Sequence, residues 1–448
     1  MATINGTSGN DPLTRTQQAD SISGLAGDDS LLGYGFAIKG IEANDRSGDS
    51  VSNAGDFNKD GFDDIIIGSI GESEGYRFGD GSSYVVFGKS DNFRPSFNLS
   101  DLNGSNGFAL NNVGAFGVSV NSAGDVNGDG FDDIIIESNG GEYKGVITNS
   151  TIYVVFGSSE NLENRPTLSN LNGSNGFVIN DSGAAVSSAG DVNGDGFDDI
   201  IVGVADSSYV VFGKAGNFNS ELNFSTLKST LNGSNGFVIN DSGAAVSSAG
   251  DVNDDGFDDI ITVASGADVN DQSDAGSSYV IFGKVEGFGK SLNPSKLDGS
   301  NGFVINGTNP WSVTTAGDVN GDSFDDILIR SADKNYVVFG SSGNFDTSIN
   351  LSRLNGSNGF VINGTNASSV SSSAGDVNGD GFDDLIIGDS SADANGKENA
   401  GKTYVVFGKA EGFGTSLNLS DINDRNGLTI DGSDEDEQKL FIQLCRKY

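Results

Sequence analysis

The sequence predicts an all-β protein, a β-propeller of four-stranded antiparallel blades. The first observation is an internal repeat: an Asp-rich segment recurs six times, with its first aspartate at Asp56, Asp125, Asp191, Asp251, Asp318 and Asp376. Successive copies therefore lie 69, 66, 60, 67 and 58 residues apart, and a fixed period indicates a repeat architecture. The second observation is that each period holds short Val-, Ile- and Phe-rich runs bounded by Gly, Asn, Asp and Ser, which predict strands and turns. Four-stranded units repeated radially form a propeller, which leaves only short sheet edges.

Each unit contains four predicted strands. In the third unit they are AAVSSAG at 184–190, DIIVG at 199–203, SYVVFG at 208–213 and GFVIN at 236–240. The first strand is rich in small residues, as expected where blades crowd around a central axis. A β-solenoid is the rival architecture, but its coils are shorter and lack a long loop in every unit. No segment before the last few residues has convincing helical periodicity.

The ends of the repeat array leave the number of blades open. The segment GFAIKG at 35–40 resembles a fourth strand with no unit before it, and GLTIDG at 427–432 ends the sixth unit. Either six blades close the ring, or residues from both ends complete an imperfect seventh blade. We therefore divide the chain into an N-terminal segment at 1–34, a propeller at 35–432 and a divergent tail at 433–448.

The loop between the first and second strands has the pattern Asp-x-Asn-x-Asp-Gly-Phe-Asp-Asp, whose nine positions are numbered 1–9 below. Oxygen ligands at positions 1, 3 and 5 can point at one centre when the loop curls, and Gly at position 6 permits the sharp turn. Ca²⁺ takes about 6–8 oxygen ligands in flexible geometry, whereas Mg²⁺ demands a tight octahedron. The alternative is a set of Asx-turn hairpins that need no metal, but six copies with one spacing favour calcium, at about six sites.

The expected ligands are the side chains at positions 1, 3, 5 and 9 and the main-chain carbonyl at position 7. Ser323 replaces the turn glycine in the fifth loop, so strain is expected there. The ligand sets are Asp56, Asn58, Asp60, Phe62 and Asp64; Asp125, Asn127, Asp129, Phe131 and Asp133; Asp191, Asn193, Asp195, Phe197 and Asp199; Asp251, Asn253, Asp255, Phe257 and Asp259; Asp318, Asn320, Asp322, Phe324 and Asp326; and Asp376, Asn378, Asp380, Phe382 and Asp384.

Composition excludes several classes of function. The chain has 63 acidic and 24 basic residues, a formal net charge of −39, which repels nucleic acid and anionic membrane surfaces. It has no His, so histidine metal sites and Ser-His-Asp catalysis are excluded. Cys445 is the single cysteine, so no disulfide forms within the chain. No apolar run reaches the roughly 18 residues of a membrane span, and we expect no transmembrane segment.

The runs SVSSAGDVNGDGFDDIIIG and SYVVFGK, which recur with small changes across residues 35–432, resemble the FG-GAP repeat of integrin α-subunit propellers and their bacterial relatives. The resemblance implies a propeller, usually of seven blades, with calcium in the loop between the first two strands. It also implies a role in adhesion or ligand binding rather than catalysis.

A second resemblance concerns the first 34 residues. GTSGNDPLT at 6–14 and GLAGDDSLL at 24–32 resemble the calcium-binding RTX nonapeptides of secreted bacterial proteins. The N-terminus lacks the basic and apolar regions of a Sec signal peptide. We therefore expect a bacterial protein, extracellular or on the cell surface, that is exported without a cleaved Sec signal.

Antiparallel strands place the Asp-rich loops on one face and the variable second-to-third loops on the other. Loops on a rigid scaffold are where binding usually occurs, so we expect a protein or glycan ligand on the face opposite the calcium loops. Tyr76, Arg77, Phe78, Tyr143 and Trp311 are bulky or basic residues of that face. We expect a monomeric adhesion or surface-binding module; a lectin-like propeller, an accessory module of a secreted enzyme and a purely structural repeat are the alternatives.

Overall fold

The computed structural model describes four three-residue strands between residues 3 and 32, and residues 37–431 with gaps. The gaps are 42–46, 49, 70–80, 91–95, 112–117, 139–140, 144–145, 149, 160–167, 183–184, 205, 268–275, 286, 308, 332–333, 344, 365–368 and 411. The tail predicted at 433–448 and the residues Tyr76, Arg77 and Phe78 therefore lie outside the described residues.

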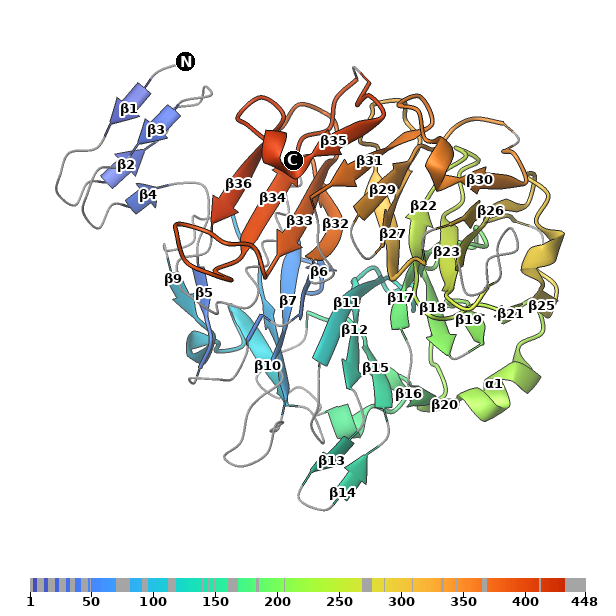
Figure 1. Ribbon diagram of the computed structural model, residues 1–448. Coiled ribbons are helices and arrows are strands. Elements are labelled where there is room, and N and C mark those ends of the chain that lie inside the picture. Colours follow the sequence, from blue (N-terminus) through green and yellow to red (C-terminus); the bar gives the residue numbers. More distant parts are fainter. Residues whose placement is uncertain are drawn as a thin grey trace.

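Six four-stranded antiparallel sheets surround a central axis, which confirms the predicted all-β propeller and gives six blades (Figure 1). The first strands of successive blades lie next to one another from blade one to blade six. In chain order the blades are β6 (Ser50–Gly55), β7 (Asp64–Ser69), β8 (Ser82–Val86) and β10 (Gly107–Asn111); β11 (Val118–Gly124), β12 (Asp133–Ser138), β15 (Ser150–Val155) and β16 (Gly176–Ser182); β17 (Ala185–Gly190), β18 (Asp199–Val204), β19 (Ser207–Val211) and β21 (Gly236–Asn240); β22 (Val246–Gly250), β23 (Asp259–Ala264), β24 (Ser277–Ile281) and β26 (Gly302–Asn306); β27 (Ser312–Gly317), β28 (Asp326–Arg330), β29 (Lys334–Val338) and β31 (Gly359–Asn363); and β32 (Ser369–Gly375), β33 (Asp384–Asp389), β34 (Lys402–Val406) and β36 (Gly427–Asp431).

Each first strand ends in a register shift just before the Asp-rich loop. In blade three the shift lies between Ser188 and Gly190, and Gly190 then pairs with Asp199, the first residue of β18. The same shift occurs in all six blades. A bulge at a strand end bends the chain, so the loop leaves every blade in the same direction.

A fifth short strand joins neighbouring blades in the middle of the array. Each lies between the third and fourth strands of one repeat, where the sequence indicated only a loop, and pairs in parallel with the fourth strand of the preceding blade. These strands are β20 (Glu221–Asn223), β25 (Ser291–Leu292), β30 (Ser348–Asn350) and β35 (Ser416–Asn418), paired with β16, β21, β26 and β31. The same relation holds between β5 (Ala37–Lys39) and β9 (Ser96–Asn98) at the start of the array.

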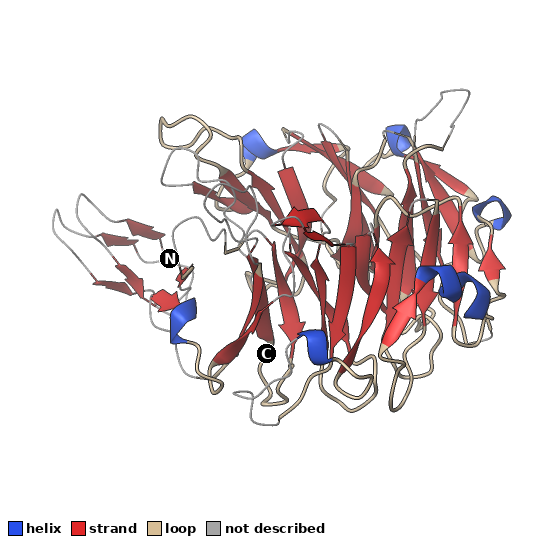
Figure 2. Cartoon of the chain, turned by 90° about the horizontal axis from the view of Figure 1, so that it is seen from below, coloured by secondary structure: helices blue, strands red, loops and turns tan. Residues whose placement is uncertain are grey.

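The helical turns of the described residues lie at the periphery (Figure 2). Contrary to the expectation of no helix, Phe224–Thr230 forms the seven-residue helix α1. Leu227 is buried, and the Thr226 and Thr230 hydroxyls donate to main-chain carbonyls. Two turns are too short to show a helical period in sequence. None of the described helices is long and apolar enough to cross a membrane.

The four short N-terminal strands pair only with one another in the described part of the chain. β1 (Thr3–Asn5) pairs in parallel with β3 (Ser21–Ser23), and β2 (Pro12–Thr14) with β4 (Ser30–Leu32). The RTX-like assignment of residues 1–34 stays a prediction. A further hairpin, β13 (Gly141–Tyr143) and β14 (Val146–Thr148), extends the β12–β15 connection and carries Tyr143.

The core is continuous from blade to blade because aromatic rings cross the junctions. Phe360 of β31 stacks on Phe413 of the following repeat, with ring centroids 4.2 Å apart and planes 3° from parallel. Phe177, Phe237 and Phe303, at the same place in the preceding blades, stack in the same way. All four of these fourth-strand rings are fully buried.

We predict that Phe360→Ala destabilises the protein by about 3–5 kcal/mol, because it removes a buried ring and leaves a cavity between two blades. The control is Val285→Ala, since Val285 is 69% exposed and its truncation should change the stability by less than about 0.5 kcal/mol. Denaturant unfolding followed by circular dichroism measures both values. Equal effects for the two variants would contradict a junction held by aromatic packing.

Candidate metal centres

The Asp-rich loop curls around the carboxylate at position 1. In the third loop, Asp191 Oδ1 accepts hydrogen bonds from the N–H groups of Gly194 and Asp195 at 2.7 and 3.1 Å, and Oδ2 accepts from Gly196 at 2.9 Å. Asp195 Oδ1 in turn accepts from the N–H of Phe197 at 3.1 Å. The bond from position 6 to position 1 recurs in all six loops. The repeated sequence therefore builds one loop geometry six times.

In the first, second and fourth loops, the side chain at position 3 lies beside the one at position 1, whereas in the third and fifth loops its amide nitrogen donates to the carboxylate at position 9. In the second loop, Asp129 N–H donates to Asp125 Oδ1 at 3.1 Å and to Asn127 Oδ1 at 2.9 Å. One amide shared by two acceptors brings the two side-chain oxygens to the same side of the loop. The carboxylate at position 5 is exposed to solvent in all six loops.

The aspartate at position 9 is buried beneath the loop and begins the second strand. Asp199 Oδ1 accepts from the N–H of Gly213 at 2.9 Å, and Oδ2 accepts from Val192 at 3.2 Å. Burial, opposed by the bond from Gly213 and assisted by the charges of Asp195 and Asp191, raises the pKa of Asp199 to about 8. Burial likewise raises the pKa of Asp64 to about 8, of Asp259 and Asp326 to about 9 and of Asp384 to about 6, and it raises that of Asp133 well above its usual value.

The donor set of each loop fits a calcium ion in its chemistry. Hard carboxylate, amide and carbonyl oxygens are the ligands of Ca²⁺, and a bound cation would offset the mutual repulsion of the loop carboxylates. Among the described residues, no group of three or more carboxylates is arranged closely enough to hold a metal ion without movement of the side chains. Both oxygens of Asp199 accept main-chain hydrogen bonds, so the predicted ligand at position 9 has a structural role in each loop. Its part in binding calcium stays a prediction, as do those of the other positions.

The sequence assigned no role to the aspartate at position 8, which links neighbouring blades. Asp258 Oδ2 accepts a hydrogen bond at 2.9 Å from the N–H of Asp191, position 1 of the preceding loop. The N–H of Asp258 donates back to the Asp191 carbonyl at 3.3 Å. We call this two-way contact the inter-blade clasp. It recurs at five junctions, from Asp132 onto Asp56, Asp198 onto Asp125, Asp258 onto Asp191, Asp325 onto Asp251 and Asp383 onto Asp318, with N···Oδ2 distances of 2.6–3.0 Å.

The clasp requires glycine at the end of the first strand. Gly190 has φ +69°, and a Cβ at this position would collide with the Asp258 carboxylate. The ring at position 7 adds a second contact: Phe257 lies against Gly194, at position 4 of the preceding loop. In the first loop, position 4 is Lys59, whose ammonium lies 4.9 Å from the centre of the Phe131 ring. The sequence feature that could have indicated this contact between blades is the second, adjacent aspartate at position 8 of every loop.

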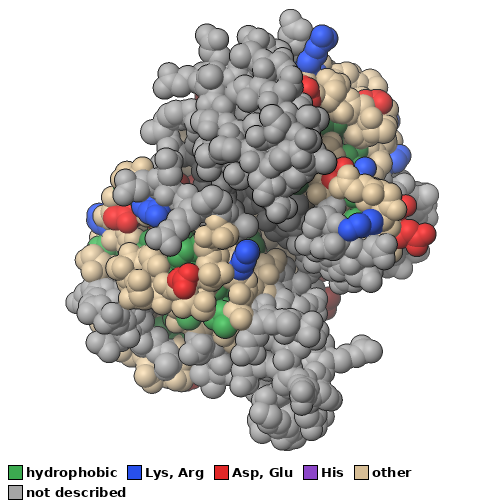
Figure 3. Space-filling model, turned by 90° about the vertical axis from the view of Figure 1, so that its left-hand side faces the viewer, with side chains coloured by type: hydrophobic (Ala, Val, Ile, Leu, Met, Phe, Trp, Pro, Cys, Tyr) green, Lys and Arg blue, Asp and Glu red, His purple; other side chains and the backbone are tan. Residues whose placement is uncertain are grey.

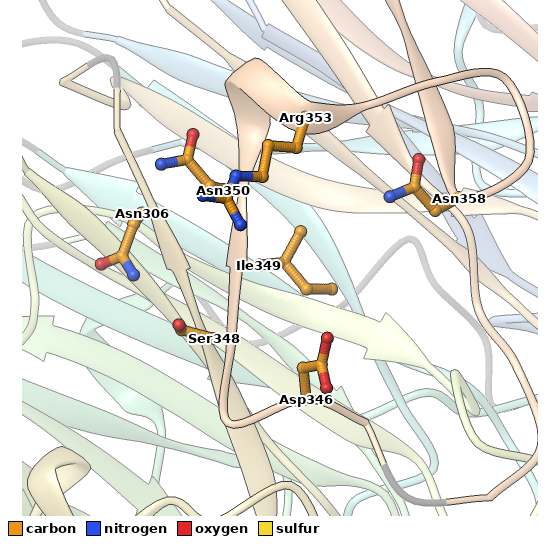
Figure 4. Close-up of a pocket in the computed structure, with 7 residues that line it drawn as sticks. All are labelled: Asn306, Asp346, Ser348, Ile349, Asn350, Arg353 and Asn358. Carbon is orange, nitrogen blue, oxygen red and sulfur yellow. The ribbon is translucent and has the colours of Figure 1, made fainter.

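Cavities on two sides of the propeller are lined by described residues. A cavity of about 330 Å³ on the face opposite the Asp-rich loops is lined by Asp206, Asp241, Tyr279 and the turn at 264–267. On the same face Trp311 is 44% exposed, and its ring lies 5.3 Å from the Arg330 guanidinium. The other cavity, of about 260 Å³, lies along β30. Figure 4 shows the residues that line it, Asn306, Asp346, Ser348, Ile349, Asn350, Arg353 and Asn358.

Known proteins share the repeat. The FG-GAP repeat model matches residues 47–86, 182–218 and 369–406. Integrin alpha-2 of Mus musculus is 36% identical over 93 residues, which is 21% of this chain and 8% of that protein. Integrin alpha pat-2 of Caenorhabditis elegans is 32% identical over 132 residues, 29% of this chain and 10% of that protein. The Caenorhabditis briggsae protein of that name is 32% identical over 161 residues, 33% and 12% of the two chains. The chain thus spans about a tenth of the length of these relatives.

The fifth loop keeps its geometry at a conformational cost. Ser323 has φ +73°, where the other loops have Gly with φ between +81° and +92°. We predict that Ser323→Gly stabilises the protein by about 1 kcal/mol, because it removes left-handed strain. The matched control is Gly256→Ser in the fourth loop, where a Cβ meets no atom within 4 Å and the cost is conformational. The melting temperature should rise in Ser323→Gly and fall in Gly256→Ser. A shift in the same direction for both variants would contradict backbone strain at Ser323.

The buried aspartates at position 9 predict a pH dependence for calcium-free protein. Asp199 keeps its proton up to a pKa of about 8 when folded, against 3.8 unfolded. Between these values the folded state binds more protons, so stability is full below the unfolded pKa and falls as the pH rises through the folded pKa. Urea midpoints measured in chelator should decrease across this range, and less so in Asp199→Asn. An increase across it would disprove the assignment.

Proposed function

Because the chain carries FG-GAP repeats in an integrin-like β-propeller, we propose that it is a calcium-stabilised module that binds a protein ligand at a cell surface or in the extracellular space. The six Asp-rich loops hold the blades in register when calcium is bound. The opposite face carries the connections that differ most from repeat to repeat. Adhesion or ligand binding is what the integrin relatives suggest for such a scaffold, and we propose no catalytic role.

The observation that supports calcium most strongly is the repeated curl of the loop. In all six loops the position 1 carboxylate accepts from the N–H of position 5. In the first, second and fourth loops the same N–H also donates to the side-chain oxygen of position 3. An isolated Asx turn needs only one such oxygen. Six calcium ions would also neutralise 12 of the 39 excess negative charges. Without them, self-repulsion opposes the compact state.

The proposed ligand-binding surface is the face that carries Trp311 and the cavity beside Tyr279. Asp206 and Asp241 give that cavity an acidic lining. Burial, and then the charge of Asp241, raises the pKa of the Tyr279 hydroxyl, which therefore stays a hydrogen-bond donor at neutral pH. These groups suit a basic side chain of a protein ligand. The extracellular location is inferred from the integrin relatives and is part of the proposal.

A second candidate function is carbohydrate binding, and the cavity along β30 favours it. Asn306, Asn350 and Asn358 offer amide donors and acceptors, and Arg353 adds a charged donor. None of the described residues that line it is aromatic, so a sugar would be held by hydrogen bonds without ring stacking. Glycan-array binding that is lost in Asn350→Ala would favour this candidate over a protein ligand.

We predict that calorimetry detects about six calcium ions per chain and that Asp195→Asn weakens one of them by about tenfold or more, which is at least about 1.4 kcal/mol. The substitution removes a ligand charge at an exposed position, so the loop itself should stay folded. Asp206→Asn is the matched control, because Asp206 is an exposed acid on the opposite face, and it should leave all six sites unchanged.

Chelation should also lower the melting temperature. A ligand present at a hundred times its dissociation constant stabilises the folded state by about 2.7 kcal/mol per site. If the protein binds no calcium and its melting temperature does not respond to chelator, the calcium proposal fails. That result would leave the assignment of the propeller fold unchanged.

A further inference from the structure

Position 4 of the Asp-rich loop faces the loop of the following blade. Gly128, at position 4 of the second loop, lies against the Phe197 ring at position 7 of the third loop, and a Cβ on this glycine would collide with that ring. The position 4 glycines of the third and fifth loops meet the ring of the next loop in the same way. A side chain at position 4 therefore extends onto the neighbouring loop.

The first loop carries a lysine at this position. Lys59 has φ +59°, in the left-handed region that favours glycine. Its ammonium donates at 3.3 Å to the main-chain carbonyl of Asp129, position 5 of the second loop, and lies 4.9 Å from the centre of the Phe131 ring at position 7. A Cβ on Gly130, between these two residues, would collide with the ammonium. The cation of blade one thus lies on the loop of blade two.

This ammonium is placed on a loop that has no cation of its own. Positions 1, 5, 8 and 9 of the second loop are aspartates, and residues 125–133 include no Lys or Arg. An ammonium there lowers the mutual repulsion of these carboxylates and repels a divalent cation among them. Because Lys59 is exposed, solvent and salt limit the size of both effects.

The charge at position 4 differs from loop to loop. Lys59 and Asp254 are its charged residues, and the other four loops have glycine. Asp254 has φ +57°, close to that of Lys59, and the fourth loop is clasped to the fifth as the first is to the second. In the view toward β5 and β9, acidic and basic side chains are interspersed over the described surface (Figure 3). The effect of a single charge is therefore set by the groups that it contacts.

We propose that the residue at position 4 sets the calcium affinity of the following loop. Lys59 lowers the affinity of the second loop, and its ammonium partly replaces the ion when calcium is scarce. This inference rests on the proposed binding of calcium by the Asp-rich loops, and it concerns the regulation of those sites. The loops of one chain then fill at different calcium concentrations although their ligand residues are the same.

The test is a calcium titration of the full chain with isotope-labelled glycine, followed by NMR, because glycine amides report each loop separately. Gly130 reports the second loop and Gly196 the third. Lys59→Met keeps a non-glycine backbone and a long apolar stem but removes the charge. We expect it to tighten calcium binding at the second loop by about threefold or more and to leave the third loop unchanged. Salt at about 1 M, where the Debye length is about 3 Å, should reduce this difference.

The melting temperature separates a role of charge from one of packing. In chelator, Lys59→Met should lower it, because the carboxylates of the second loop lose their cation. In saturating calcium the decrease should be smaller, because the variant binds the ion more tightly. A lysine that only packs on Phe131 predicts the same decrease in both conditions, and that result would overturn the proposal.

Asp254→Lys transfers the charge to a loop whose position 4 already holds a non-glycine residue. Its control is Asp254→Met, which differs from it mainly by the ammonium. The fifth loop, reported by Gly321, should bind calcium about threefold or more weakly in Asp254→Lys than in Asp254→Met. Equal affinities in this pair would overturn the proposal that position 4 acts on the following loop.

The titration also separates this proposal from the one on which it rests. If none of the loop glycines responds to calcium, calcium binding by the loops fails, and the role of Lys59 fails with it. If Gly196 responds while Gly130 gives the same affinity in the wild type and in Lys59→Met, calcium binding stands and the role of Lys59 alone is overturned.

Discussion

The architecture depends on one contact, the carboxylate of position 8 bound to the first main-chain amide of the preceding loop. It fixes the distance between neighbouring blades at the level of the loops, because the carboxylate and the amide meet at 2.6–3.0 Å. It also explains why the first strands of blades one to five end in glycine, since a side chain there would collide with the carboxylate from the next blade. A hydrogen bond to a charged acceptor is stronger than one between neutral groups, and the contact is repeated five times.

The two adjacent aspartates of each loop have opposite tasks because neighbouring residues in an extended chain point to opposite sides. Asp199 turns inward and accepts two main-chain hydrogen bonds from its own blade, whereas Asp198 turns outward to the neighbouring blade. Burial and then nearby charge raise the pKa of both. The propeller therefore concentrates carboxylates where they repel one another, and this arrangement favours a cation in solution.

The sequence was sufficient to predict the blades, their four antiparallel strands and the loop that begins at each first-strand glycine, because these features are local and recur in period. It was not sufficient for contacts that cross between repeats. The fifth strands, such as β20, are two or three residues long and have no partner in their own repeat. The role of Asp258 depends on an amide 67 residues away.

Because β20 pairs with the fourth strand of the preceding blade, one repeat of the sequence does not coincide with one blade of the fold. Residues 171–200 and 231–260 are nearly identical and lie 60 residues apart, so the spacing of these two copies is that of one whole unit. A segment of that length contains three strands for one blade, the fourth strand of another and the short strand that fastens the two together. Gain or loss of such a segment changes the number of blades without breaking a junction, so the circumference of this scaffold can evolve by whole units while every interface keeps its chemistry.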